Sequence, residues 1–174
     1  AVIFLNSPSN PTGRVLGVDH LRKVVGWARE RGTLVVSDEC YLGLGWDQQP
    51  YSVLHPEVSG GDHTGLLAVH SLSKSSSLAG YRAGFVAGDP AVVAELLAVR
   101  KHAGMMVPAP VQHAMTVALR DDTHVETQRA AYGRRRALLL EAVARAGMRV
   151  DHSEAGLYIW ATREEDCWTT VSDL

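Results

Sequence analysis

Cysteines and long apolar runs are both scarce in this sequence, and each shortage excludes a class of protein. Among the 174 residues only Cys40 and Cys167 are cysteines, too few for a disulfide framework and consistent with a reducing compartment. No apolar run approaches the ~20 residues of a membrane-spanning helix, and no signal peptide opens the chain. These features predict a cytoplasmic globular protein without a membrane partner.

An excess of charge of one sign is also missing. The formal net charge is -2, which removes the strongest electrostatic argument for nucleic acid as a partner. Arg134–Arg136 is interpreted as a solvated helix face, because consecutive helical residues spread around the axis. Cys40 is interpreted as a small buried side chain, and His70 as a core histidine. The eight histidines show no His-x-x-x-His spacing, so no metal site is expected.

The two ends of the sequence are unusual. It begins without methionine inside the apolar run Ala1–Leu5, and it stops at Leu174 with no helix stop signal nearby. Length alone suggests about one domain. The ends lead us to expect a piece of a longer protein.

In the first half of the chain, short apolar runs alternate with amphipathic helices. A helix capped by Asp19 and ended by Gly32 is expected, then another over residues 91–102. The side chains of Val92, Leu96 and Val99 in the second helix are expected to face the core. Strands are predicted over residues 1–5, 34–37, 66–72 and 84–87. Because continuous apolar strands are typical of sheets covered on both faces, the order predicts an α/β fold with a largely parallel sheet.

Longer helices dominate the second half. One helix is expected to run to about Arg120 and another from Thr123 to Ala146, followed by short strands over residues 148–151 and 157–162. We predict a domain boundary near residues 121–122. The proposed parts are a partial large domain over residues 1–121 and a partial C-terminal small domain over residues 122–174.

Polar side chains follow three of the predicted strands. Asn10 lies in the loop after the first strand, Asp38 at the end of the second, and Lys74 just beyond the third. The carboxyl ends of parallel strands meet at one edge, where ligands bind. A lysine suits a Schiff base, hydroxyls and a guanidinium suit a phosphate, and a carboxylate suits a protonated ring nitrogen. Together these are the requirements of pyridoxal phosphate.

Three segments then resemble one family. Residues 71–84, Ser-Leu-Ser-Lys-Ser-Ser-Ser-Leu-Ala-Gly-Tyr-Arg-Ala-Gly, resemble the lysine-attachment signature of the class I and II aminotransferases of fold type I. Asn10–Gly13 is similar to their Asn-Pro-Thr-Gly loop, and Ser37–Tyr41 to their Asp-x-x-Tyr segment. The resemblance covers essentially the whole chain. It implies a three-layer α/β large domain with a mostly parallel sheet, and the start of a smaller α+β domain.

The resemblance also implies roles for single residues. Lys74 would form the Schiff base with pyridoxal phosphate and move a proton at the substrate Cα. Asp38 would pair with the pyridinium nitrogen. Tyr41 and Asn10 would bind the 3′ oxygen of the cofactor, and Asn10 also the substrate α-carboxylate. The catalytic set is therefore expected to be Lys74, Asp38 and Tyr41.

The phosphate group is assigned to the end of the same signature. Ser71 and Arg82 are expected to bind it, and Ser73 is a further candidate. Gly80 and Gly84 have two interpretations: they allow the backbone to approach the cofactor closely, or they are an ordinary turn glycine and strand-start glycine.

The likeness extends to a subfamily, the N-succinyldiaminopimelate aminotransferases. It rests on Asn6–Asn10, Tyr41–Asp47, Arg100–Pro110 and Ala155–Trp160. It implies that a homodimer transfers an amino group between glutamate and N-succinyl-2-amino-6-ketopimelate, in diaminopimelate and lysine synthesis. Another class I/II aminotransferase, a C–S lyase and the aminotransferase-like sensor domain of a transcription regulator stay open. Relatives use further segments around the cofactor and substrate, so we expect this chain alone to have little or no transaminase activity.

Overall fold

A computed structural model describes residues 1–104 and 106–172 of the chain. Met105, which belongs to the segment Arg100–Pro110 of the subfamily likeness, lies outside the described residues, as do residues 173–174. The strands are β1 (Val2–Asn6), β2 (Leu34–Asp38), β3 (Leu66–Ser71), β4 (Gly84–Gly88), β5 (Arg149–His152) and β6 (Trp160–Thr162). The helices are α1 (Val18–Glu30), α2 (Pro56–Ser59), α3 (Leu72–Ser75), α4 (Pro90–Ala103), α5 (Ala109–Ala118), α6 (Thr123–Arg145) and α7 (Cys167–Ser172), with a 3-10 turn η1 (Ala79–Tyr81).

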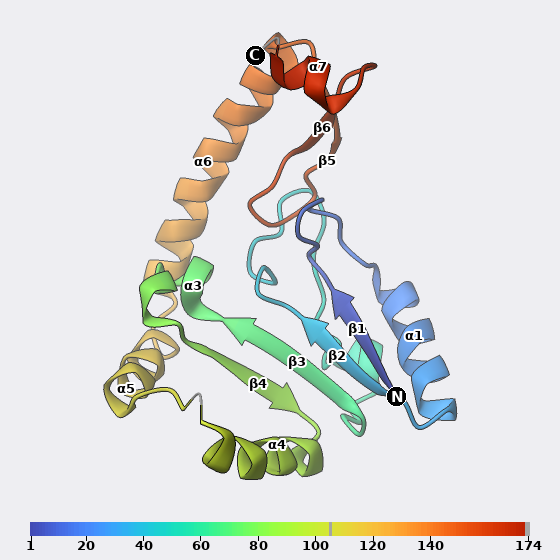
Figure 1. The fold of residues 1–174 in the computed structure, drawn as a ribbon, viewed down its shortest axis with the longest axis vertical. Coiled ribbons are helices and arrows are strands. Elements are labelled where there is room, and N and C mark those ends of the chain that lie inside the picture. Colours follow the sequence, from blue (N-terminus) through green and yellow to red (C-terminus); the bar gives the residue numbers. More distant parts are fainter. Residues whose placement is uncertain (105, 173–174) are drawn as a thin grey trace.

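Four strands form the main sheet in the order β1-β2-β3-β4 (Figure 1). Strands β1, β2 and β3 are parallel, whereas β4 runs antiparallel beside β3. Helix α1 carries the chain from β1 to β2, as a parallel connection requires. Residues 72–83 form only α3 and η1, so the chain returns beside the strand it has just left. The prediction of an α/β fold with a mostly parallel sheet is confirmed.

The main core lies between α1 and this sheet. Leu21, Val25 and Ala28 recur on one face of α1 and are buried in one cluster with Val35 and Leu66. Full burial of a Leu or Val side chain contributes ~1.5–3 kcal/mol. This packing fixes α1 against β2 and β3, and so holds the ends of those strands in place.

Helix α1 begins earlier than the sequence predicts. Its N-cap is Gly17, and Asp19 lies in the first turn, where it pairs with Arg22 at 2.8 Å. The prediction that Asp19 caps this helix is wrong, because the helix includes Val18, whose side chain packs against the core. Gly32 does follow the helix end, and its φ of +56° is one that glycine adopts without strain.

Helix α4 presents its apolar residues differently from the prediction. Val92 is half-buried, but Leu96 and Val99 are exposed. The expectation that all three face the core is therefore wrong. Figure 1 shows α4 alongside the outer strand β4 rather than across the face of the sheet, so the sheet covers little of the helix.

Asp89 joins the start of α4 to the start of β3. Its Oδ1 accepts a hydrogen bond from the N–H of Ala91 at 2.9 Å, and its Oδ2 accepts one from the N–H of Gly65 at 2.8 Å. Both bonds hold the pKa of the Asp89 carboxyl below its ordinary value, and the bond from Gly65 contributes most. A carboxyl with a lowered folded-state pKa stabilises the fold above its unfolded-state pKa, and this contribution is lost as the pH falls through the folded-state pKa.

Asp89→Asn is therefore expected to lower the thermal unfolding midpoint by several degrees at pH 7. The amide has no charge and one hydrogen-bond acceptor fewer. The difference in unfolding midpoint between the variant and the parent should shrink as the pH falls toward 3. Circular dichroism melting at the two pH values measures both effects, with Asp19→Asn on α1 as the exposed control. An equal difference at both pH values would contradict the role of the ionised carboxyl.

Helix α6 carries the chain to a second sheet, in which β5 and β6 pair antiparallel (Figure 1). Both strands were predicted, but β6 begins only at Trp160. Residues 157–159 lie instead in the loop before β6, in which Ala155 forms an isolated β-bridge with Gly45 of the segment that follows β2. The domain boundary near residues 121–122 stays a prediction.

The arginine run on α6 is not a uniform solvated face. Only 19% of the Arg136 side chain is exposed. Its Nε donates to Ser153 Oγ at 2.9 Å, and its Nη2 donates to Ser153 O at 2.8 Å and to Asp47. Arg135 lies over the ring of Tyr132. The expected solvated face is wrong for Arg136, because α6 turns this one of the three side chains toward the loop before β6.

Two features are absent from residues 1–104 and 106–172. None of the helices there combines the length and apolar character needed to cross a membrane. The same residues contain no group of three or more His, Cys, Asp or Glu side chains arranged to hold a metal ion.

Candidate active site

The carboxyl ends of β1, β2 and β3 lie at one edge of the main sheet. In the strand register Asn6 neighbours Asp38, and Asp38 neighbours Val69. Figure 1 shows the three arrows pointing toward the same side of the molecule. The segments that carry Asn10, Asp38 and Lys74 all leave the sheet at this edge, as predicted.

Asn10 lies in a loop that is tied to the end of β1. Its backbone N–H donates to Oδ1 of Asn6 at 2.7 Å, and the N–H of Ser7 donates to the carbonyl of Asp38 at 3.2 Å. These bonds hold the loop beside the end of β2. Asn10 is exposed at this edge.

Strand β3 ends at a pair of serines followed by the candidate lysine. Ser71 is the N-cap of α3, and its Oγ accepts from the N–H of Ser73 at 3.1 Å. The two hydroxyls are hydrogen-bonded at 2.9 Å. Lys74 lies in α3 and is half-buried. Buried Leu72 packs with Met115 of α5, which fixes this short helix to the rest of the fold.

Arg82 is placed near the serines by the pairing of β3 with β4. Ser71 pairs with Gly84, two residues after Arg82. Arg82 has a φ of +52°, is exposed, and its Nη1 donates to the carbonyl of Ala79 at 3.0 Å.

The two glycines of this segment have different roles. A Cβ on Gly84 would lie 2.6 Å from the carbonyl oxygen of His70, so the close approach there is to the neighbouring strand. A Cβ on Gly80 would meet nothing within 4 Å. The strand-start interpretation therefore accounts for Gly84, and the role of Gly80 stays a prediction.

Asp38 and Tyr41 belong to one turn at the end of β2. Asp38 is exposed, and its Oδ1 accepts from the N–H of Cys40 at 3.1 Å. Tyr41 is only 7% exposed, and its hydroxyl lies 2.7 Å from that of Tyr158. Burial first, and then the hydrogen bond with Tyr158, raise the pKa of Tyr41 well above its ordinary value. Tyr41 therefore keeps its proton at neutral pH.

Cys40 has the properties of an unreactive thiol. It is half-buried, and burial, followed by its hydrogen bond with Asp38, raises the pKa of Cys40 to about 12. A thiol with this pKa is thiolate in only about one molecule in ten thousand at pH 8. This agrees with the interpretation that Cys40 is not a nucleophile.

We expect iodoacetamide at pH 8 to modify Cys167, which is exposed on α7, far faster than Cys40. Mass spectrometry of peptides over time measures the two rates, and Cys167→Ser should remove the fast phase. Rapid labelling of Cys40 in that variant would contradict the raised pKa.

Glu39, next to Asp38, is a completely buried carboxylate. Its Oε1 accepts from the N–H of Val53 at 2.8 Å, and its Oε2 lies 3.5 Å from Nε2 of His70. The His70 ring stacks on Phe85 with centroids 4.9 Å apart. Glu39 therefore joins the end of β2 to β3, beside the residues predicted to act.

Sequence reasoning missed Tyr158, which the structure brings to this edge. Residues 153–158, here called the return loop, precede β6. Within it the N–H of Ala155 donates to the carbonyl of Gly13 at 3.0 Å, and the N–H of Gly156 donates to that of Leu44 at 2.8 Å. The loop thus contacts Asn10–Gly13 through Gly13 and Ser37–Tyr41 through the hydroxyl of Tyr41. The only sequence signal was the subfamily likeness of Ala155–Trp160, which indicated no role for Tyr158.

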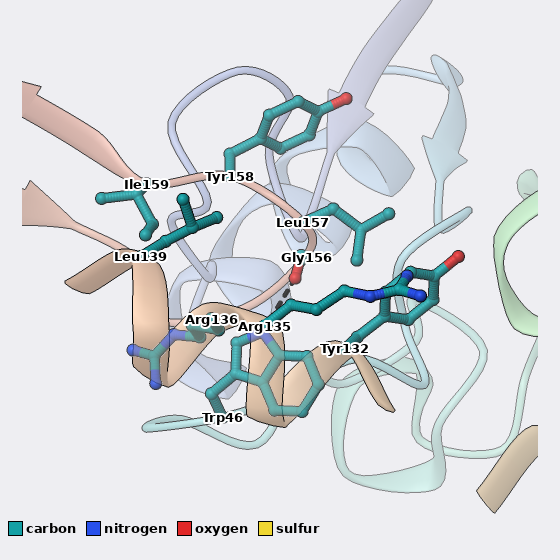
Figure 2. A pocket seen from close by; sticks show the side chains of 9 residues that line it. All are labelled: Trp46, Tyr132, Arg135, Arg136, Leu139, Gly156, Leu157, Tyr158 and Ile159. Atoms are coloured by element: carbon teal, nitrogen blue, oxygen red, sulfur yellow. Dashed lines mark hydrogen bonds between the residues drawn. The ribbon is translucent and has the colours of Figure 1, made fainter. Parts of the chain in front are cut away.

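A cavity of about 190 Å³ lies on the other side of the return loop (Figure 2). It is lined by Trp46, Tyr132, Arg135, Arg136, Leu139, Gly156, Leu157, Tyr158 and Ile159. Nε1 of Trp46 donates to the carbonyl of Gly156 at 2.8 Å. In Figure 2 the ring of Tyr158 points away from Trp46 and Arg135. The Tyr158 hydroxyl is directed instead toward Tyr41.

Comparison with known proteins identifies the family. The family model described as aminotransferase class I and II matches residues 1–170. The chain belongs to the class I and II aminotransferases. These aminotransferases, with their structural neighbours of fold type I, depend on pyridoxal phosphate.

Individual relatives agree with this assignment. The chain is 76% identical over 167 residues to the probable aminotransferase Rv1178 of Mycobacterium tuberculosis (strain ATCC 25618 / H37Rv), covering 96% of this chain and 40% of that protein. It is 61% identical over 173 residues to the 4-dedimethylamino-4-oxo-anhydrotetracycline transaminase OxyQ of Streptomyces rimosus, covering 99% and 48%. An LL-diaminopimelate aminotransferase of Dehalococcoides mccartyi (strain ATCC BAA-2266 / KCTC 15142 / 195) is 33% identical, with 92% and 41% covered.

A solved structure shows the same fold. The crystal structure of an aminotransferase from Neisseria meningitidis Z2491 matches with a TM-score of 0.83 at 32% identity, covering 92% of this chain and 41% of that chain. The aminotransferase chain described here therefore spans less than half the length of these relatives.

Proposed function

We propose that the protein containing this chain is an aminotransferase that uses pyridoxal phosphate to move an amino group between glutamate and an oxo-acid. The observation that carries the proposal is the common sheet edge at which the segments of Asn10, Asp38 and Lys74 end their strands.

The side chains at this edge fit pyridoxal phosphate by their chemistry. Ser71 and Ser73 provide two hydroxyls 2.9 Å apart, and Arg82 provides a fork of N–H donors near the same end of the β3–β4 pair. Such donors suit a phosphate group. The Asp38 carboxylate suits a protonated ring nitrogen, and the Lys74 amine suits an aldehyde. Groups suited to the phosphate, the ring nitrogen and the aldehyde of the cofactor are thus supplied from neighbouring strand ends.

Lys74 has two tasks in this proposal. Bound pyridoxal phosphate supplies an electron sink for the electron pair left at the substrate Cα. The Nζ of Lys74 would hold the cofactor through its aldehyde carbon, C4′, until a substrate amine takes its place. The freed Lys74 amine would then move a proton between the substrate Cα and C4′. Packing of α3 through Leu72 keeps the backbone of Lys74 at this edge.

The other residues hold the cofactor and adjust its charge. The negative charge of Asp38 favours the protonated ring nitrogen, which keeps the ring electron-withdrawing. Tyr41, which keeps its proton, donates to the 3′ oxygen of the cofactor. The side chain of Asn10 binds that oxygen and the substrate α-carboxylate.

For the oxo-acid we propose N-succinyl-2-amino-6-ketopimelate. The subfamily likeness of four segments supports it, as does 33% identity to an enzyme named for LL-diaminopimelate. A second candidate is a polycyclic ketone, which is favoured by 61% identity to a transaminase named for 4-dedimethylamino-4-oxo-anhydrotetracycline.

Borohydride trapping tests the cofactor assignment. The whole protein is incubated with pyridoxal phosphate, reduced, digested and mapped by mass spectrometry. The reduced adduct is expected on Lys74, and an adduct confined to other lysines would overturn the assignment.

A substrate panel tests the reaction. Formation of 2-oxoglutarate from glutamate is followed with each acceptor in turn, and the succinylated keto acid is expected to give the fastest turnover. Faster turnover with the polycyclic ketone would select the second candidate. With a thioether amino acid as the sole substrate, release of ammonia and pyruvate would indicate a C–S lyase.

We also propose that the whole protein is a homodimer. The likeness to the family, whose members are homodimers, supports this proposal. Light scattering during size-exclusion chromatography measures the mass, and a monomer at micromolar concentration would contradict the proposal.

A further inference from the structure

Tyr158 connects the return loop to the candidate cofactor edge. Its hydroxyl lies 2.7 Å from that of Tyr41, and the two rings meet edge to face with centroids 5.6 Å apart. Tyr41 is buried and Tyr158 is half-buried, so this hydrogen bond is partly shielded from water. A shielded hydrogen bond between two phenols fixes the direction of the O–H group that donates and leaves the other proton available to a further acceptor.

We propose that Tyr158 is a positioning residue that orients and polarises the Tyr41 hydroxyl toward the 3′ oxygen of pyridoxal phosphate. This inference rests on the proposed function, in which Tyr41 donates to that oxygen. A phenol hydroxyl can donate one hydrogen bond and accept another. Tyr41 can therefore donate a hydrogen bond to the cofactor while it accepts one from the Tyr158 hydroxyl. In such a chain each hydrogen bond strengthens the next by ~10–30%.

The return loop holds Tyr158 against Tyr41 through its backbone. Gly156 donates to Leu44 at 2.8 Å and accepts from Nε1 of Trp46 at 2.8 Å. Its φ is +76°, and a Cβ at this position would lie 3.7 Å from the Tyr41 ring. Two hydrogen bonds of Gly156 thus tie the loop that carries Tyr158 to the segment that follows Tyr41.

The charges around Tyr41 agree with a donor role. Besides Tyr158, the titratable groups that act on Tyr41 are Asp38 and Cys40, and both raise its pKa. Tyr41 is therefore neutral and has a proton to donate. The Asp38 carboxylate and the protonated Cys40 thiol are its neighbours on the same turn.

The test is a spectrophotometric pH titration of the bound cofactor without substrate, in the whole protein. The group that titrates is the nitrogen through which Lys74 holds the cofactor. A hydrogen-bond donor to the 3′ oxygen stabilises the negative charge of that oxygen most after this nitrogen has lost its proton. A weaker donor therefore raises the pH at the midpoint of the titration. Tyr158→Phe is expected to raise the midpoint by about 0.3 pH unit, and Tyr41→Phe by about 1 pH unit. The double variant should match Tyr41→Phe, and Tyr51→Phe, in the core beneath the sheet, should match the parent.

The outcomes separate the two proposals. An unchanged or lowered midpoint in Tyr158→Phe, beside a raised one in Tyr41→Phe, would overturn the role of Tyr158. A Tyr158→Phe shift that persists in full on top of Tyr41→Phe would overturn it too, because Tyr158 would then not act through Tyr41. If no coloured cofactor binds, or if Tyr41→Phe leaves the midpoint unchanged, it is the proposed function that fails.

Discussion

Lys74→Ala in the whole protein is expected to lower kcat for transamination by a factor of ~10⁴ or more. Acid–base catalysis by one positioned side chain is worth ~10²–10⁴, and the same Nζ also holds the cofactor covalently in our proposal. Alanine keeps the helical preference of α3, so the fold should survive. Formation of 2-oxoglutarate from glutamate measures the loss.

The matched control is Lys23→Ala, which removes an exposed lysine from α1. It is expected to keep parental turnover and the borohydride-reducible adduct, whereas Lys74→Ala should lose both. Thermal unfolding of both variants shows whether the fold is intact. A reducible adduct that persists in Lys74→Ala would show that Lys74 is not the attachment residue.

Asp38→Asn is expected to slow the half-reaction with glutamate by ~10²–10³, the usual effect of removing one preorganised electrostatic group. The amide is nearly isosteric, and its Oδ1 can still accept from the N–H of Cys40. What is lost is the negative charge beside the ring nitrogen, and with it the preference for the protonated ring. Stopped-flow absorbance of the bound cofactor measures the rate.

Asp19→Asn, on an exposed side chain of α1, serves as the control and is expected to react at the parental rate. Cofactor affinity is measured in parallel, because Asp38→Asn should also bind pyridoxal phosphate more weakly. A parental rate and affinity in Asp38→Asn would mean that Asp38 does not face the ring nitrogen.

Local patterns predicted the elements that depend on neighbouring residues. The apolar spacing of Leu21, Val25 and Ala28 predicts the buried face of α1, because these side chains lie on one side of a helix wherever it packs. The continuous apolar runs likewise predict the parallel strands, and with them the edge at which their carboxyl ends meet. The predictions failed where packing decided. Val18 is part of α1 ahead of Asp19, and α4 does not lie across the face of the sheet, so Val99 is exposed.

The sequence by itself determined that Asn10, Asp38 and Lys74 each follow a strand of one predicted sheet. The order of the strands along the chain and their apolar pattern are local properties of the sequence. Only the tertiary structure decided that Arg136 contacts Asp47 and that Tyr158 lies on Tyr41. These contacts join residues far apart in the chain. They depend on the length and direction of α6 and on the backbone hydrogen bonds of the return loop, which no local pattern encodes.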